Sequence, residues 1–227
     1  MKNFFISENG QMSETAVTLF FITLSGGLQD AYTYIIRGGT FANAQTGNIV
    51  LMSDKLFTGN VTGALKYCVP VTAFAFGIFV SSLIRYNFKQ NKIIHWRQII
   101  LLIEIVILFL VAFIPQNLNN LANAAVSFAC AMQVETFQKI NTHSFASTMC
   151  IGNLKSGVEA MSMYICTKNR DYFEKAEHYI FIILSFALGA GLGSFFSFLK
   201  EKLIILSCVL LAVSFFIMFI DKKQNSR

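Results

Sequence analysis

The sequence predicts an all-α membrane protein, a polytopic bundle of about six transmembrane helices with two short half-helices. Three observations predict this class. Of the 227 residues, 55% are hydrophobic and only 13% are charged, about half the charged share of a soluble domain. The mean hydropathy is +0.57. The apolar residues, 24 Phe among them, gather in runs of the length that a helix needs to cross a bilayer, about 20 residues.

Six apolar runs, in chain order, are candidate spans within one membrane domain that covers residues 1–227. The first and the fourth carry an acid near the C-terminal end. The third and the sixth are short but almost wholly aliphatic and aromatic. Two shorter segments, residues 41–52 and 145–163, mix small, polar and apolar residues, and we interpret them as half-helices. The six runs are residues 15–36, 62–84, 98–114, 118–137, 179–199 and 203–220.

The two halves of the chain resemble each other at an offset of 105 residues. This offset carries Asp30 onto Glu135. It also carries the pair Gly47 and Asn48 onto Gly152 and Asn153. We therefore interpret the chain as two copies of one unit, residues 15–114 and 118–220.

A unit of three spans ends on the opposite side of the membrane, so the second unit would be inverted relative to the first. Lys and Arg concentrate on the cytoplasmic side of a membrane. With six spans, 13 of the 18 Lys and Arg lie on the side of the two termini. With eight spans, the two sides share them almost evenly. We predict six spans and cytoplasmic termini, and a seven-span arrangement, in which only residues 145–163 also cross, stays open.

Asp30 and Glu135 are the first candidates for function. A carboxylate deep in a bilayer costs roughly 2.5–3.5 kcal/mol and usually faces a cavity or a partner. Burial also favours the protonated form of a carboxyl, which suits a proton-carrying or cation-coupling role. The alternative is that both acids lie near the interface and form surface pairs, Asp30 with Arg37 and Glu135 with Lys139.

Glu104 is a further acid, alone in the aliphatic run IILLIEIVILFLV. Such a residue must face the protein interior or be neutral. Lys66 and Lys155 are candidate partners. Lys155 can also pair with Glu159, which lies four residues further along one helix.

The two short segments supply the polar groups from which we predict a substrate or ion pathway. A non-spanning segment at membrane depth must satisfy its own backbone groups or lie against protein or water. Structural support and substrate contact both fit these side chains. Gly47 and Gly152 would let a neighbouring helix approach closely. The predicted pathway residues, acids included, are Asp30, Asn43, Thr46, Gly47, Asn48, Glu135, Gly152 and Asn153.

Small residues recur every four positions in the second and fifth runs, at an offset of 112 residues. This spacing puts them on one helix face, which is typical of close packing between membrane helices. We predict packing roles for Gly77, Gly189 and Gly193.

Several function classes are disfavoured. The five Cys form no C-x-x-C and no cluster with His, so we predict no disulfide, no metal site and no cofactor. No Ser/His/Asp order, HExxH, P-loop or dinucleotide fingerprint occurs, so we do not expect an enzyme. The net charge of +6 lies in short segments between apolar runs, as topology determinants do, so we expect no nucleic-acid binding.

Residues 26–31 (GGLQDA), 41–43 (FAN) and 46–48 (TGN) resemble the YoaK-like family of bacterial membrane proteins. The family pattern resembles a Gly-x-x-Asp-Ala turn, a Phe-x-x-x-x-Thr-Gly-Asn segment and about six predicted spans. The similarity covers nearly the whole chain, although Gln45 stands where Met is common. It implies a protein of the bacterial cytoplasmic (inner) membrane. The family has no known function, so the resemblance implies no substrate.

These features favour a small secondary transporter or permease in the lipid bilayer. Inverted repeats are common in secondary transporters, which bind near the midplane where the repeats meet. Asp30 and Glu135 would be the coupling acids, and the half-helices would line the path of a small solute or ion. With six spans, a homo-oligomer would complete the pathway. The alternative is a non-transporting scaffold or accessory subunit, and a channel is a third option.

Overall fold

The computed structural model describes residues 15–88, 95–140, 143–144, 148 and 150–224, and it is almost entirely helical. A π-helical turn, Tyr32–Ile36, extends the first helix, and 3-10 turns at Gln116–Leu118 and Ser197–Ile204 precede the fifth and the last. Within the described residues, the α-helices are α1 (Ala16–Ala31), α2 (Gln45–Phe57), α3 (Val61–Phe88), α4 (Trp96–Val111), α5 (Asn119–Thr136), α6 (Cys150–Thr167), α7 (Arg170–Phe195) and α8 (Ile205–Gln224).

The predicted all-α class is confirmed. The described part of the chain contains one β pairing, in which the two-residue strands β1 (Lys139–Ile140) and β2 (His143–Ser144) run antiparallel. The two predicted short segments both form helices. Helix α2 begins and ends a few residues later than predicted, and α6 ends later, while residues 145–147 and 149 of the second segment lie outside the described residues.

Three of the six predicted spans are long and apolar enough to cross a membrane: α3, α7 and the stretch Ser197–Met218 that includes α8. The other three runs also form helices. However, α1 and α4 have 16 residues each and α5 has 18. Helices of these lengths measure about 24–27 Å, less than the roughly 30 Å of a bilayer core. The π-helical turn Tyr32–Ile36 continues α1 by five residues, and Pro115 follows α4.

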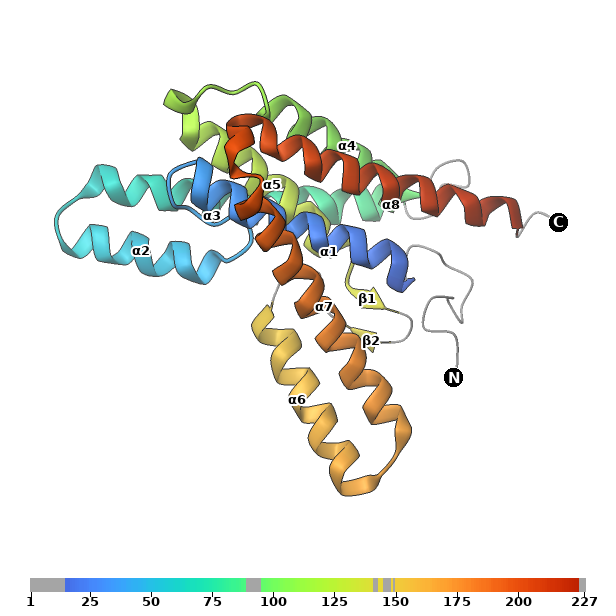
Figure 1. Ribbon diagram of the computed structural model, residues 1–227. Coiled ribbons are helices and arrows are strands. Elements are labelled where there is room, and N and C mark those ends of the chain that lie inside the picture. Colours follow the sequence, from blue (N-terminus) through green and yellow to red (C-terminus); the bar gives the residue numbers. More distant parts are fainter. Residues whose placement is uncertain (1–14, 89–94, 141–142, 145–147, 149, 225–227) are drawn as a thin grey trace.

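Helices from the two halves of the chain alternate in the bundle (Figure 1). The most extensive packing joins α1 to α7 and α3 to α5. Within each half, the short helix lies along the long helix that follows it, α2 on α3 and α6 on α7. Helices α4 and α8 pack on each other and on α5 and α1 respectively. The hairpins α2–α3 and α6–α7 diverge from this bundle (Figure 1).

Small residues allow the two main helix pairs to lie close together. A Cβ added to Gly189 on α7 would lie 2.8 Å from the carbonyl carbon of Leu24 on α1. A Cβ added to Gly193 would lie 2.6 Å from the Cβ of Ala31. On α3, a Cβ added to Gly77 would meet α5 equally closely. The three glycines predicted to pack therefore all lie in helix interfaces.

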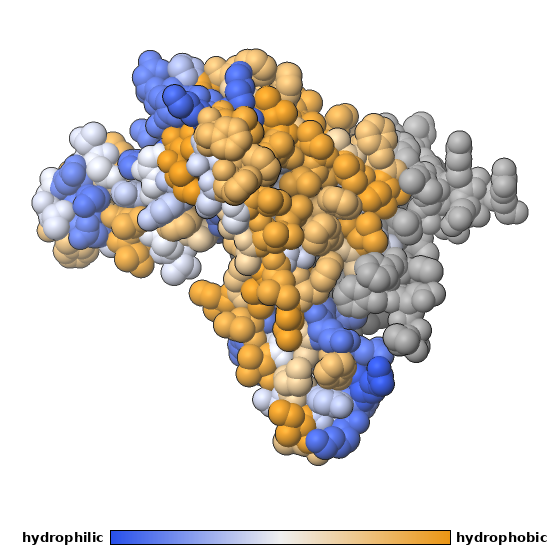
Figure 2. All heavy atoms as spheres, viewed as in Figure 1, coloured by the Kyte–Doolittle hydropathy of each residue, from blue (hydrophilic) through white to orange (hydrophobic). Residues whose placement is uncertain are grey.

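The outer surface of the bundle is apolar. On the face drawn in Figure 2, apolar residues cover the middle of the molecule, and hydrophilic residues lie at the upper end of the bundle and towards the far ends of the two hairpins. On α7, Leu184, Leu188 and Phe195 are all more than half exposed. An apolar surface of this extent suits contact with lipid tails, which need no hydrogen bonds from the protein.

Candidate functional site

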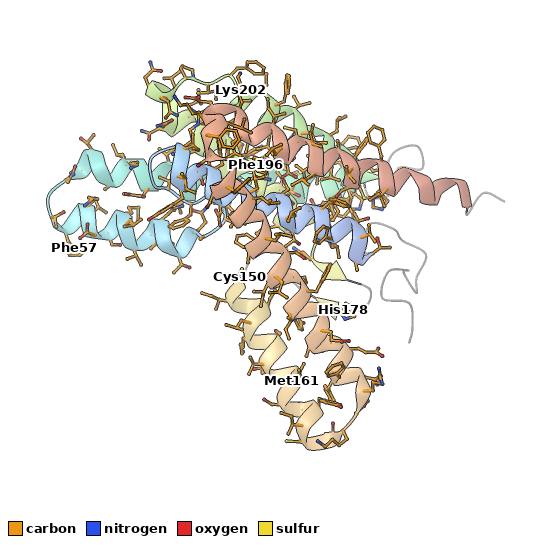
Figure 3. All side chains as sticks on the ribbon, viewed as in Figure 1. Phe57, Cys150, Met161, His178, Phe196 and Lys202 are labelled. Atoms are coloured by element: carbon orange, nitrogen blue, oxygen red, sulfur yellow. The ribbon has the colours of Figure 1, made fainter. Side chains whose placement is uncertain are left out.

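A cavity of about 820 Å³ lies where the two halves of the chain meet. The N-terminal ends of α2 and α6 line it together with the end of α1 and the middle of α3 and α7. Figure 3 shows Cys150 at the N-terminal end of α6, beside α7. Both short helices therefore begin at one site, as half-helices at a binding site do.

The lining combines polar groups from both halves with an apolar wall. Of the predicted pathway residues, the lining includes Asp30, Asn43, Thr46, Gly152 and Asn153, and it does not include Gly47, Asn48 or Glu135. Gln45, Thr148 and Ser156 add further polar groups, and the apolar wall consists mainly of Val71, Phe74, Ala75, Ile78, Ile151, Tyr179 and Phe186.

Asp30 is the residue around which the first polar segment folds. Its Oδ1 accepts a hydrogen bond of 2.7 Å from the backbone N–H of Asn43, and its side chain is almost wholly buried. The chain returns to Asp30 because Gly38 and Gly39 adopt positive φ angles that suit glycine and reverse its direction after the π-helical turn. The carboxyl thus meets the positive N-terminal side of α2, where an acid is favourable.

Two buried oxygens of the cavity have no hydrogen-bond partner. The Nδ2 of Asn43 donates to the carbonyl oxygen of Gly26 at 3.2 Å, but its Oδ1 is unpartnered. The Oγ1 of Thr148 is also unpartnered. Asn43 and Thr148 are 5% and 6% exposed, and both line the cavity. An unpartnered buried acceptor costs free energy, so such groups call for a ligand or water.

Asn48 supports the segment and does not face the cavity. Its Oδ1 accepts from the N–H of Phe41 at 2.9 Å, and its Nδ2 donates to the carbonyl of Phe41 at 2.7 Å and to the Oε1 of Gln45 at 2.9 Å. The prediction that Gly47 and Gly152 admit a neighbouring helix was wrong. A Cβ at Gly47 would instead lie 3.0 Å from the Phe41 ring, and Gly152 faces open space.

Glu135 has different surroundings from Asp30. Its Oε1 lies 3.6 Å from the guanidinium of Arg85, and its Oε2 accepts a 2.8 Å hydrogen bond from Gln138. The described residues that follow Glu135 enter the β1–β2 pairing. The alternative pair with Lys139 involves a side chain outside the described part of the chain.

Comparison with known proteins fits this geometry. Residues 18–217 match the model of a family described as "Protein of unknown function (DUF1275)". The chain belongs to the DUF1275 family. The resemblance seen in the Asp-Ala and Thr-Gly-Asn motifs is thereby confirmed. These motifs supply Asp30, which accepts from the backbone of Asn43, and Asn48, which bonds the backbone of Phe41. No curated protein and no solved structure matches the chain.

The DUF1275 protein is therefore a multi-pass integral membrane protein whose family has no known function.

Glu104 lies at the centre of the DUF1275 protein, next to the site. It is fully buried, and its Oε1 accepts from the Nε2 of Gln29 at 3.2 Å. Its Oε2 has no partner. The predicted lysine partners were wrong, because α1 presents Gln29 to α4 at this point. Lys155 instead lies 3.6 Å from Glu159, and Lys66 lies over the ring of Tyr67.

Gln29 links Glu104 on α4 to Cys130 on α5. Its Oε1 accepts from the thiol of Cys130 at 2.7 Å, and its Nε2 also donates to Ser25 at 3.0 Å. Asp30 follows Gln29 in the chain and faces the cavity instead. Sequence reasoning missed Gln29, although its position beside the acid in GGLQDA was the available signal. It also missed the cavity's aromatic wall, because Phe74, Tyr179 and Phe186 are inconspicuous in apolar runs.

Arg37 does not pair with Asp30, which removes the alternative of a surface helix contact. Arg37 is fully buried and has no acidic partner among the described hydrogen bonds. Its Nε donates to the hydroxyl of Tyr32 at 2.7 Å. Its Nη2 donates to the carbonyl oxygens of Val111 and Ile114 at the end of α4. Its Nη1 donates to the carbonyl oxygen of Pro115 and to the Oδ1 of Asn119, which follow α4 in the chain. A cation at a helix C-terminus is favourable.

Proposed function

We propose that this DUF1275 protein is a small secondary transporter whose solute binds in the cavity between α2 and α6. The observation that carries the proposal is the meeting of two half-helix N-termini, one from each half of the chain, at one cavity with an acid and unpartnered polar oxygens. Secondary transporters place such broken or short helices at their binding sites.

The packing pattern supports an inverted repeat of residues 15–114 and 118–220. Helix α1 of the first unit packs on α7 of the second, and the equivalent helix of the second unit, α5, packs on α3 of the first. The pairs α2–α3 and α6–α7 correspond in the same way, and Gly77 and Gly189 lie at equivalent crossings. We extend the proposal to six spans, with α1, α4 and α5 as the shorter ones, and to cytoplasmic termini in a bacterial inner membrane.

Asp30 is the acid that we assign to solute contact and coupling, because it alone of the two equivalent acids lines the cavity. Glu135 has the Arg85 guanidinium as a partner, and its predicted coupling role stays a prediction. We expect no enzymatic activity, because the sequence contains no nucleophile and base in a catalytic motif. A homo-oligomer would be compatible with the exposed apolar face.

The experiment is cysteine labelling of the cavity in proteoliposomes. The five native Cys are replaced, and a single Cys is introduced by Thr46→Cys on α2 or Ser156→Cys on α6, both of which line the cavity. A membrane-impermeant maleimide is then added from either side. Leu188→Cys is the control, because Leu188 is 51% exposed on α7 but does not line the cavity.

If the protein is a transporter with alternating access, both cavity cysteines should react with maleimide added from either side. The lipid-facing Leu188→Cys control should not react from either side. Lys55→Cys, in the last turn of α2, is the positive control for labelling. If it reacts and neither cavity position does, the scaffold or accessory-subunit alternative is favoured. Single-channel currents through the reconstituted protein would favour a channel instead.

A further inference from the structure

The cavity has the chemistry of a site for one kind of ligand group. Asp30 is the only residue with a formal charge at neutral pH among the described residues that line it, and no Lys, Arg or His joins it there. The Oδ1 of Asn43 and the Oγ1 of Thr148 are buried, unpartnered oxygens in the same lining. Three residues with oxygen acceptors thus belong to one lining, with Asp30 as the charged one, and a cationic N–H group can satisfy a carboxylate acceptor.

The opposite wall is apolar and aromatic. Phe74 on α3 and Tyr179 and Phe186 on α7 all line the cavity. Aromatic faces attract cations, and a mainly apolar wall buries the carbon body of a ligand. At the N-terminal side of α2, the Asp30 carboxyl accepts from the backbone and offsets the positive helix end. The N-terminal end of α6 lines the same cavity without an acid among its lining residues and favours an anion, so an anionic probe of similar size belongs in the test. An inorganic cation would leave the aromatic wall unused.

We propose that this cavity binds a small organic ammonium ion with an apolar body, its N–H groups directed to the carboxylate of Asp30. The proposal rests on the transporter function above and names its solute class. A ligand the size of a phenylalkylamine fits within about 820 Å³, since pockets of about 300–1,000 Å³ hold drug-sized ligands.

The test is binding to the full-length protein in detergent, measured by isothermal titration calorimetry with two probes of similar size. The probes are 2-phenylethylamine, a cation, and 3-phenylpropanoate, an anion. Saturable binding of the amine, without binding of the anion, is expected. Asp30→Asn should weaken amine binding at least about tenfold, because a hydrogen bond to a charged group is worth about 1.5–3 kcal/mol. Glu159→Gln removes an acid outside the cavity and should leave binding unchanged.

Ala75→Trp provides a second variant that does not depend on the fold tolerating Asp30→Asn. Ala75 lies on an exposed part of α3 and lines the cavity, so the larger ring should fill the cavity and abolish binding. Binding of the anion in place of the amine, or amine binding that survives both variants, would overturn the ammonium assignment. Absence of any binding, with both cavity cysteines still labelled by maleimide, would overturn the solute class and leave the transporter proposal standing.

Discussion

Gly189 is the position where one added methyl group tests the packing of the two halves most directly. In Gly189→Ala, the new Cβ would lie 2.8 Å from the carbonyl carbon and 3.0 Å from the Cα of Leu24, and closer still to its carbonyl oxygen. These are backbone atoms, which cannot rotate away. Helices α1 and α7 must therefore separate by roughly 1 Å, and a gap of that size removes about half of each dispersion contact.

The expected loss of stability follows from two opposing terms. Overpacking costs about 1–3 kcal/mol, and the upper end applies because a backbone must shift. Alanine in a helix is favoured over glycine by about 0.5–1 kcal/mol, which offsets part of this cost. The net destabilisation is about 2 kcal/mol, which corresponds to a fall in Tm of about 4–8 °C for a chain of this size.

The assay is thermal unfolding in detergent, followed by the fluorescence of Trp96. The matched control is Gly191→Ala, which gains the same helix propensity two residues away on α7 but has no atom within 4 Å of its new Cβ. The control should keep or raise the Tm. If both variants shift the Tm by the same amount, the stability loss does not come from the close approach of α1 and α7 at Gly189, and the expected overpacking is refuted.

Three further variants test the buried polar groups. Arg37→Met leaves the carbonyls of Val111 and Ile114 unpaired and should cost about 3 kcal/mol or more in the thermal unfolding assay, with exposed Lys55→Met as its neutral control. Asn48→Ala should destabilise by about 2 kcal/mol and speed hydrogen exchange at the Phe41 amide, and an unchanged exchange rate would contradict the bracing role. Glu104→Gln keeps an acceptor for Gln29 without a buried carboxyl and should be equally or more stable. A large loss would show that the fold needs its charge.

The composition of the cavity could be predicted from the sequence to a useful extent. In an apolar chain, a polar segment such as TFANAQTGN must lie against protein or water. The repeat of Gly-Asn at a fixed offset then indicated that two such segments belong together. Asp30, Asn43 and Thr46 from the first segment and Gly152 and Asn153 from the second do line one cavity.

The partners of individual buried charges could not be predicted. A helix pattern shows which residues share a face, but not which residue of a distant helix lies opposite, because that depends on crossing angle and depth. Glu104 faces Gln29, 75 positions away in sequence, and not a lysine. Arg37 lies against the end of α4, which no local spacing indicates. The aromatic residues of the cavity wall could not be predicted for the same reason, since any Phe in an apolar run could equally face lipid.

The different surroundings of Asp30 and Glu135 suggest how one duplicated unit can yield a single site. The first acid is followed by two glycines that turn the chain back, so backbone N–H groups and the side chain of Asn43 gather around it. The second acid has the guanidinium of Arg85 on α3 beside it, which compensates its charge. If the acids of both halves lined the cavity, two negative charges would lie near one ligand, and a small cation of single charge could not balance them. Asp30 stays at the cavity and Glu135 pairs with Arg85, so a single negative charge there matches the singly charged ammonium ion proposed above. Neutralising Asp30 should therefore weaken amine binding more than neutralising Glu135.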